Sequence, residues 1–223
     1  MLGLRYYRRN PLKQERMAKF INMTCFSGSV GGFVGCMGPF GFYVRSKPKK
    51  SLKPPTAGQL ATRAKMALVG GYLKPLKEMV YLGFAASYKV KSKTAAMNMA
   101  VAHAMHNAIG GTYPDLSIKP EQIVLSRGKV PKLWKPQVQL QGKQLHVTWR
   151  PLANFCSFAD DCVYVLGYNV KAKTVAVREA VREAASVTID LEAEPPGSTV
   201  HLYVCVSNRE SKLFSNSQYL GEF

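Results

Sequence analysis

Two histidines come closest to a metal-binding arrangement in this sequence. His103 and His106 lie three residues apart in a stretch whose apolar spacing predicts a helix, so one helix face could present both imidazoles. The sequence supplies no carboxylate or third ligand nearby, and the surrounding residues are mostly Ala and Met. This pattern favours structural histidines, and we expect no metal ion.

Other residue types suited to catalysis also lack the spacing that catalysis needs. Asp160 and Asp161 are adjacent, so a strand would point them to opposite faces, and a loop turn explains them better. Asp115 follows Pro114 and also indicates a turn. Ser29 lies in GSVGG without the strand-to-helix context of a nucleophile elbow. We therefore expect no catalytic residue, no cofactor and no enzymatic activity.

The best-suited chemistry is the binding of a polyanion. Arginines near the N-terminus alternate with Tyr6 and Tyr7, and Arg with Tyr can pair with phosphates and stack on bases. No zinc-finger, helix-turn-helix or RNA-recognition motif is present, so such binding would be tolerant of sequence. The candidate residues are Arg5, Arg8, Arg9, Arg45, Lys47, Lys49, Lys50, Lys53, Arg63 and Lys65.

The charge distribution limits where a polyanion could bind. The chain has 223 residues and a net charge of +18. Residues 1–55 carry 11 Lys or Arg and one acid, residues 56–142 carry 12 and three, and residues 143–223 carry eight and nine. Only the first two-thirds of the chain is therefore a candidate, and a solvated basic surface is the alternative interpretation.

The hydrophobic content and the cysteines limit the class of protein that this sequence can encode. With 47% hydrophobic residues, the chain can bury a core and form one large or two small domains. Its five cysteines are scattered and form no CxxC pair, which fits a reducing compartment. We expect a cytoplasmic protein without a signal peptide, or one incorporated in a larger assembly. Met17 is an alternative translation start.

A glycine-rich, uncharged segment follows the basic N-terminus. The 25 residues from Phe20 to Val44 carry no charge and are long enough to span a bilayer. Six glycines and a proline make a poor helix, which argues against a membrane role. Gly32, Gly35, Gly38 and Gly41 recur every third residue, which favours a hairpin-like or closely packed extended segment. We expect residues 1–55 to form an extended Gly-rich and basic arm.

A basic strap leads from this segment into a helical region. Prolines 48, 54 and 55 favour polyproline II geometry over residues 45–55, and Thr56 with Gln59 has the spacing of a helix-starting capping box. Apolar stripes predict helices over residues 57–109, interrupted at Pro75 and closed by Gly110 and Gly111. A short strand is predicted over Gln122–Ser126, so residues 56–135 form a helical unit with a short strand.

The remaining sequence favours strands. Alternating or β-branched runs predict strands over residues 144–149, 162–168, 186–191, 199–207 and 214–220. Their spacing suggests an antiparallel β-sandwich over residues 136–223 that buries its own core. We therefore expect an α+β fold with a small helical unit, a β-sandwich and an extended N-terminal arm.

The order of these strands resembles a fibronectin type III module. Trp149 ends the second strand, a strand with Tyr164 and Tyr168 follows, and Leu191 precedes a Pro-Gly turn into the VHLYVCV strand. Over residues 17–223 the chain also resembles the domain-of-unknown-function family 6266 found in Bacteroidetes. That resemblance rests on FSGSVGGFVG at 26–35, PPTAGQLATRAK at 54–65, AIGGTYPDLSI at 108–118, LSRG at 125–128 and SNSQYLG at 215–221. The family implies no activity.

Two functional hypotheses follow. The first is a non-enzymatic structural or assembly protein that docks to a protein partner or to itself through the β-sandwich and the N-terminal arm, as parts of phage-like or surface assemblies do. The second is a sequence-tolerant nucleic-acid-binding protein that uses the basic two-thirds of the chain.

Overall fold

The chain forms two compact units. The computed structural model describes residues 19–20, 25–38, 40–49, 53–88, 92–151, 157–191 and 197–223. The units divide between Pro54 and Pro55, one residue from the boundary that the sequence predicts after residue 55.

The N-terminal unit contains a four-stranded antiparallel sheet in the order β1-β2-β3-β4. Its strands are β1 (Lys19–Phe20), β2 (Phe26–Val30), β3 (Phe33–Gly38) and β4 (Gly41–Ser46). The hairpin-like geometry predicted from the glycines is confirmed. The prediction of an extended arm is wrong over Phe26–Ser46, because the chain folds back on itself twice there.

Two glycines allow this sheet to form. Gly31 has a φ of +55° in the two-residue turn between β2 and β3, where Val30 pairs with Phe33. A side chain at such a φ is strained, so glycine favours the tight hairpin. A Cβ on Gly35 would overlap the carbonyl oxygen of Phe26 and lie 2.8 Å from its ring. Gly35 therefore lets Phe26 lie directly on the backbone of β3.

The second unit begins with three helices, α1 (Ala57–Leu73), α2 (Lys77–Tyr88) and α3 (Lys93–Asn107). The predicted capping box is confirmed: the Gln59 N–H donates to Thr56 Oγ1, and the Thr56 N–H donates to Gln59 Oε1 at 3.1 Å. The predicted interruption at Pro75 is also confirmed, since it lies between α1 and α2. The helix therefore starts and stops where its local chemistry dictates.

Two local predictions after the helices are wrong. Gly110 and Gly111 do not close α3, which is capped by Ala108; they lie in β5 (Ile109–Thr112), which pairs with β6 (Asp115–Ile118). Gly111 is needed there because a Cβ would overlap the Asp115 carbonyl oxygen. The stretch 122–126 forms no strand, because the 3-10 helix η1 (Pro120–Gln122) turns the chain and the residues after it pair with no strand.

Seven antiparallel strands follow and form two sheets. The orders are β10-β9-β12-β13 and β11-β8-β7. The bounds are β7 (Trp134–Gln141), β8 (Gln144–Arg150), β9 (Cys162–Asn169), β10 (Thr174–Val181), β11 (Ser186–Asp190), β12 (Val200–Ser207) and β13 (Gln218–Glu222), with the 3-10 helix η2 (Arg182–Ala184) after β10. The fold is therefore mixed, with three helices and mostly antiparallel sheets, as the α+β prediction requires.

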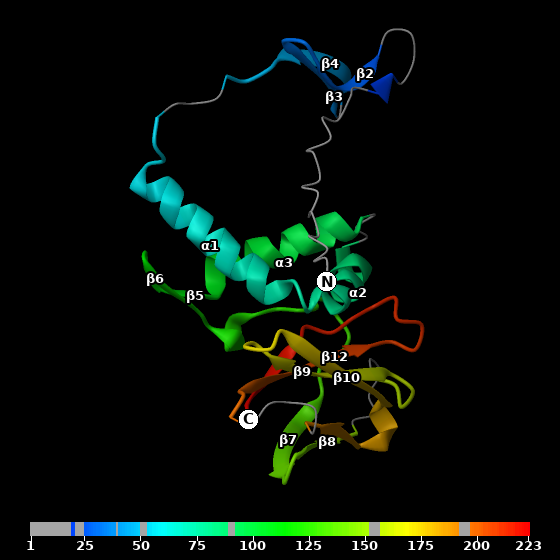
Figure 1. Cartoon of the computed structure of the whole chain (residues 1–223). Coiled ribbons are helices and arrows are strands. Elements are labelled where there is room, and N and C mark those ends of the chain that lie inside the picture. The colour runs from blue at the N-terminus through cyan, green and yellow to red at the C-terminus, as the bar shows by residue number, and fades with distance from the viewer. Residues whose placement is uncertain are drawn as a thin grey trace, which may run out of the picture. The chain divides into compact units, whose positions relative to one another are not determined.

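The β10-β9-β12-β13 sheet lies between the helices and the three-stranded sheet (Figure 1). Successive side chains of a strand point to opposite faces. In β12, Leu202 and Val204 therefore pack against the three-stranded sheet, whereas Tyr203 and Cys205 pack against the helices. All eight residues of β12 are buried.

This layering changes the predicted division of the chain. The boundary expected after residue 135 falls inside the second compact unit, because β9 and β12 contribute side chains to the core that the helices bury. Residues 136–223 do share a core between the two sheets, which includes Trp149. They do not bury all of their apolar surface without the helices.

The helices are short or polar by the standard of membrane spans. Over the described ranges, none of them is both long enough and apolar enough to cross a bilayer.

Candidate functional site

The predicted polyanion-binding residues are only partly within the described residues. Arg5, Arg8, Arg9 and Lys50 lie outside them. Arg45 lies near the end of β4, and Lys47, Lys49 and Lys53 follow it as exposed residues. Arg63 and Lys65 lie on α1 in the second unit, where Arg63 is exposed and Lys65 is half-buried. The described residues thus bring three cations, at 45, 47 and 49, into one short run.

The β2–β4 sheet presents an apolar face that the described residues of its unit leave uncovered. Residues paired across antiparallel strands share a face, so Phe33 lies on the same face as Val30, and Met37 on the same face as Phe42. Phe33 is 59% exposed and Met37 is 61% exposed. We define the apolar sheet face as Phe26, Val30, Phe33, Met37, Phe42 and Val44.

The centre of this face is ordered by aromatic packing. The rings of Phe26 and Phe42 meet edge to face with their centroids 5.8 Å apart, above the glycine at position 35. Phe33 and Met37 occupy the positions on β3 on either side of that glycine. The apolar sheet face is therefore a preformed surface, and such exposed apolar patches mark interaction sites.

A pocket of about 590 Å³ lies in the second unit. Its walls come from α1, the end of β6, η1, the turn between β9 and β10, and the ends of β12 and β13. Tyr72 and Tyr168 form part of its floor and meet edge to face with ring centroids 5.0 Å apart. Sequence reasoning missed this pocket because most of its walls come from segments that are far apart in the sequence.

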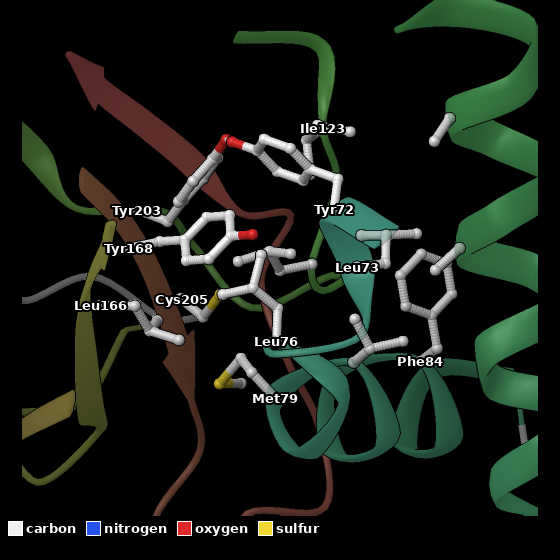
Figure 2. Packing of buried hydrophobic residues seen from close by; sticks show 14 of the residues in the cluster. Tyr72, Leu73, Leu76, Met79, Phe84, Ile123, Leu166, Tyr168, Tyr203 and Cys205 are labelled. Carbon is white, nitrogen blue, oxygen red and sulfur yellow. The ribbon is translucent and has the colours of Figure 1, made fainter. Parts of the chain in front are cut away.

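A hydrogen-bonded pair of tyrosines lies beside the pocket (Figure 2). The Tyr203 hydroxyl donates to the Pro120 carbonyl oxygen at 2.9 Å, which leaves the Tyr72 hydroxyl to donate to Tyr203 Oη at 2.8 Å. Burial raises the pKa of both phenols well above the ordinary value. Both hydroxyls therefore stay protonated at neutral pH and join α1, η1 and β12.

His201 also lines the pocket. Its Nδ1 lies 3.0 Å from the Tyr219 hydroxyl. Burial lowers the pKa of His201, against the opposing effect of Glu222 and Glu121. The imidazole is therefore neutral at pH 7, and its Nδ1 can accept the Tyr219 proton.

The two aspartates considered for catalysis have structural environments. Asp161 Oδ2 accepts a hydrogen bond from the Phe158 N–H at 3.1 Å, which confirms the predicted loop turn. The same oxygen lies 3.1 Å from Nε of Arg182, and both side chains are only 2% exposed. Asp160 forms a looser pair with Arg209 at 3.6 Å on the surface.

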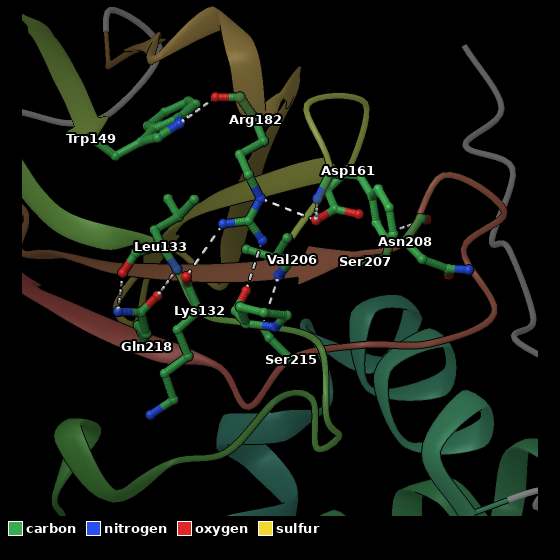
Figure 3. A network of polar contacts seen from close by, with 12 residues as sticks. Lys132, Leu133, Trp149, Asp161, Arg182, Val206, Ser207, Asn208, Ser215 and Gln218 are labelled. Carbon is green, nitrogen blue, oxygen red and sulfur yellow. Dashed lines mark hydrogen bonds and ion pairs between the residues drawn. The ribbon is translucent and has the colours of Figure 1, made fainter. Parts of the chain in front are cut away.

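Arg182 joins several segments around this buried ion pair (Figure 3). Its guanidinium donates to the carbonyl oxygens of Pro131 and Lys132, and its own carbonyl oxygen accepts from Trp149 Nε1 at 2.8 Å. A buried charge is tolerated when it is paired and its remaining donors are satisfied. Sequence reasoning missed this network, because nothing in the sequence distinguishes Arg182 from the exposed Arg178 four residues earlier.

The two histidines of α3 do not form a metal site with their neighbours. No group of three or more His, Cys, Asp or Glu suited to a metal ion occurs over the ranges that the structure describes. His103 Nδ1 is buried without a hydrogen-bond partner there. Burial, followed by Arg127 and His106, lowers the pKa of His103 and keeps it neutral at pH 7.

Cysteine chemistry is also restricted by burial. Cys36, Cys162 and Cys205 are free thiols. Cys205 is fully buried beneath the helices, and burial raises the pKa of its thiol to about 12. A thiol that stays protonated at neutral pH is a poor nucleophile, so Cys205 serves packing.

Comparison with known proteins gives a family and no function. A comparison with curated proteins finds no match. The model of a family of unknown function, DUF6266, matches residues 25–221, which include the apolar sheet face, the three helices and strands β5 to β13 except Glu222. The match covers most of the chain, so the chain belongs to the DUF6266 family.

Proposed function

We propose that this chain is a non-enzymatic assembly protein whose N-terminal sheet docks onto a second copy of the chain. The observation that carries the proposal is the apolar sheet face, with Phe33 and Met37 each about 60% exposed. Exposed apolar patches on a folded unit are stabilised when a partner removes them from water.

The connection between the units supports docking between copies. Residues 47–55 contain three prolines, a composition that favours a stiff, extended linker with a reach of about 3.1 Å per residue or roughly 30 Å in total. Residues 1–54 form a compact unit of their own. A stiff linker with a compact unit at its end suits an arm that reaches a neighbouring subunit.

Charge also supports this pairing. Residues 1–55 carry a net charge of +10, whereas residues 143–223 carry nine acids and eight bases. The near-neutral C-terminal part of another copy therefore repels an N-terminal unit less than another N-terminal unit does.

We propose further that the two sheets form a fibronectin type III-like sandwich, which would be the rigid body of each subunit. This assignment is supported by seven antiparallel strands that form one sheet of four and one sheet of three, with a core shared between the two sheets. Modules of this kind commonly serve as binding and spacing units, an analogy at the level of the fold.

Light scattering over a concentration series tests the assembly proposal. The full chain is expected to self-associate as its concentration rises, and residues 55–223 alone are expected to remain monomeric. A full chain that stays strictly monomeric at every concentration would overturn self-assembly and leave a different protein as the partner.

Nucleic-acid binding is the second candidate. It is favoured by the run of Arg45, Lys47 and Lys49, which are exposed, and none of which forms an ion pair with the described residues. If about six phosphates are neutralised, the logarithm of the binding constant should fall with the logarithm of salt concentration with a slope near −5. Filter binding across a salt series tests this, and salt-insensitive or absent binding would exclude it.

A further inference from the structure

The pocket in the second unit has the size and lining of a small-molecule site. Its volume of about 590 Å³ falls within the range of about 300–1,000 Å³ that holds drug-sized ligands. Ile118, Pro120 and Val170 supply apolar walls, and Tyr72 and Tyr168 supply aromatic ones. The lining therefore suits a ligand with a hydrocarbon or aromatic body.

Gly71 indicates that this space is kept open. It lies inside α1 and lines the pocket, and a Cβ built on it would meet no other atom within 4 Å. Glycine inside a helix destabilises the helix relative to residues with side chains. Close packing does not require glycine here, so its effect is to leave room in the pocket beside α1.

The pocket also has polar groups available to a ligand. Tyr168 is 1% exposed and lines the pocket, and no hydrogen bond to its hydroxyl is found among the described residues. That hydroxyl is therefore available to a ligand in the pocket as a donor or an acceptor. His201 lies on the same wall and is oriented by its contact with Tyr219.

The charged groups at the rim favour an anion. Lys171 and Lys173 project from the turn between β9 and β10 as exposed residues, and neither forms an ion pair with the described residues. Glu222 is the single acid among the lining residues. The rim therefore carries a net positive charge above an apolar floor.

From these observations we infer that the pocket binds an amphipathic carboxylate, with its hydrocarbon body against Gly71 and Tyr72 and its anionic head toward Lys171 and Lys173. This binding site is separate from the apolar sheet face that the proposed function uses, so it does not depend on self-assembly. A bound ligand would stabilise the second unit by linkage, because it binds the folded state alone.

The test uses dodecanoate as the ligand and 1-anilinonaphthalene-8-sulfonate as the fluorescent probe, with the full-length protein. Gly71→Leu is the blocking variant, because its side chain would enter the pocket. Gly70→Leu is the matched control, since Gly70 is the preceding helix residue, has no other atom within 4 Å of an added Cβ, and does not line the pocket. Both changes replace glycine by a better helix former, so both variants should keep or raise the melting temperature.

We expect dodecanoate to displace the probe from the wild type and from Gly70→Leu, and to raise their melting temperatures. Gly71→Leu should lose dodecanoate binding at least tenfold while it remains folded. Equal dodecanoate affinity in the two glycine variants would overturn the site.

The charge of the ligand is tested separately. Replacing Lys171 and Lys173 together by Gln should weaken dodecanoate binding about fivefold, as expected for exposed charge pairs, and should leave binding of dodecan-1-ol unchanged. If the alcohol binds the wild type as tightly as the carboxylate does, the anionic class of ligand is wrong.

Discussion

The hydroxyl oxygen of Tyr72 in α1 lies 2.8 Å from the hydroxyl oxygen of Tyr203 in β12, 131 residues further along the chain. Because Tyr203 also donates to the Pro120 carbonyl oxygen, one pair of side chains joins a helix, a 3-10 turn and a central strand. The helices and the β10-β9-β12-β13 sheet therefore form one packed body.

This relationship predicts unequal effects of removing the two hydroxyls. Tyr203→Phe leaves both the Pro120 oxygen and the Tyr72 hydroxyl without a partner, so it should lower the free energy of unfolding by about 1–3 kcal/mol. Tyr72→Phe keeps the bond to Pro120 and should cost only about 0.5–1.5 kcal/mol. Urea denaturation of both variants and the double variant measures their coupling, and strictly additive costs would contradict the shared network.

The buried Asp161–Arg182 pair predicts a large effect of removing one charge. Arg182→Met would leave the Asp161 carboxylate buried without a counter-charge, so we expect a loss of about 3–5 kcal/mol in urea denaturation. The matched control is Arg209→Met, which breaks the exposed pair with Asp160 and should change stability by less than about 1 kcal/mol. Similar losses in the two variants would show that the buried network is not the source of stability.

Local signals were sufficient to predict part of the fold. The Thr56 capping box, the break at Pro75 and the alternating strand over Gln144–Trp149 each depend on residues close together in sequence, and all three are found. Two strands of the larger sheets in the second unit were missed. β7 alternates polar and apolar residues only over Gln137–Gln141, after Pro136 at a register shift, and a proline argues against a strand. β10 is an edge strand with charged residues in its middle, so it lacks the alternation of a half-buried strand.

The candidate sites depended on contacts that local signals do not encode. The glycines between Phe26 and Ser46 indicated close backbone approach, but the pairing of Phe33 with Val30 and of Met37 with Phe42 sets which residues share a face. The pocket joins Gly71 to Val170 and His201, which no spacing rule relates. Tyr72 appeared in the sequence only as one member of an apolar helical stripe.

The lowered pKa of His201 predicts how stability changes with pH. The unfolded chain binds a proton near the ordinary histidine pKa of about 6.5, whereas burial keeps the folded imidazole neutral to lower pH. The free energy of unfolding should therefore fall as pH decreases from about 7.5 through 6.5, by at most about 1.4 kcal/mol per pH unit from this group. His201→Gln should flatten the slope of stability against pH between about 7 and 5.5, and an unchanged slope would show that other groups dominate.

Shared packing predicts that the seven strands need the helices. In a fragment of residues 136–223, the sheet face that carries Leu166, Tyr203 and Cys205 would be exposed to water, because the helices that cover it are missing. We expect that fragment to aggregate or to melt without cooperativity, while residues 55–223 melt cooperatively. A sharp, reversible melt of residues 136–223 in circular dichroism would instead confirm the independent β unit that the sequence suggested.

Sedimentation velocity on variants of the apolar sheet face tests the proposed assembly most directly. Phe33→Ser with Met37→Ser removes the two most exposed apolar side chains of β3 on that face, whereas Tyr43→Ser removes an exposed aromatic from the opposite face, where Tyr43 pairs with Cys36. We expect the wild type and Tyr43→Ser to self-associate with rising concentration and the double variant to sediment as a monomer. Equal self-association of the double variant and the wild type would contradict docking through the apolar sheet face.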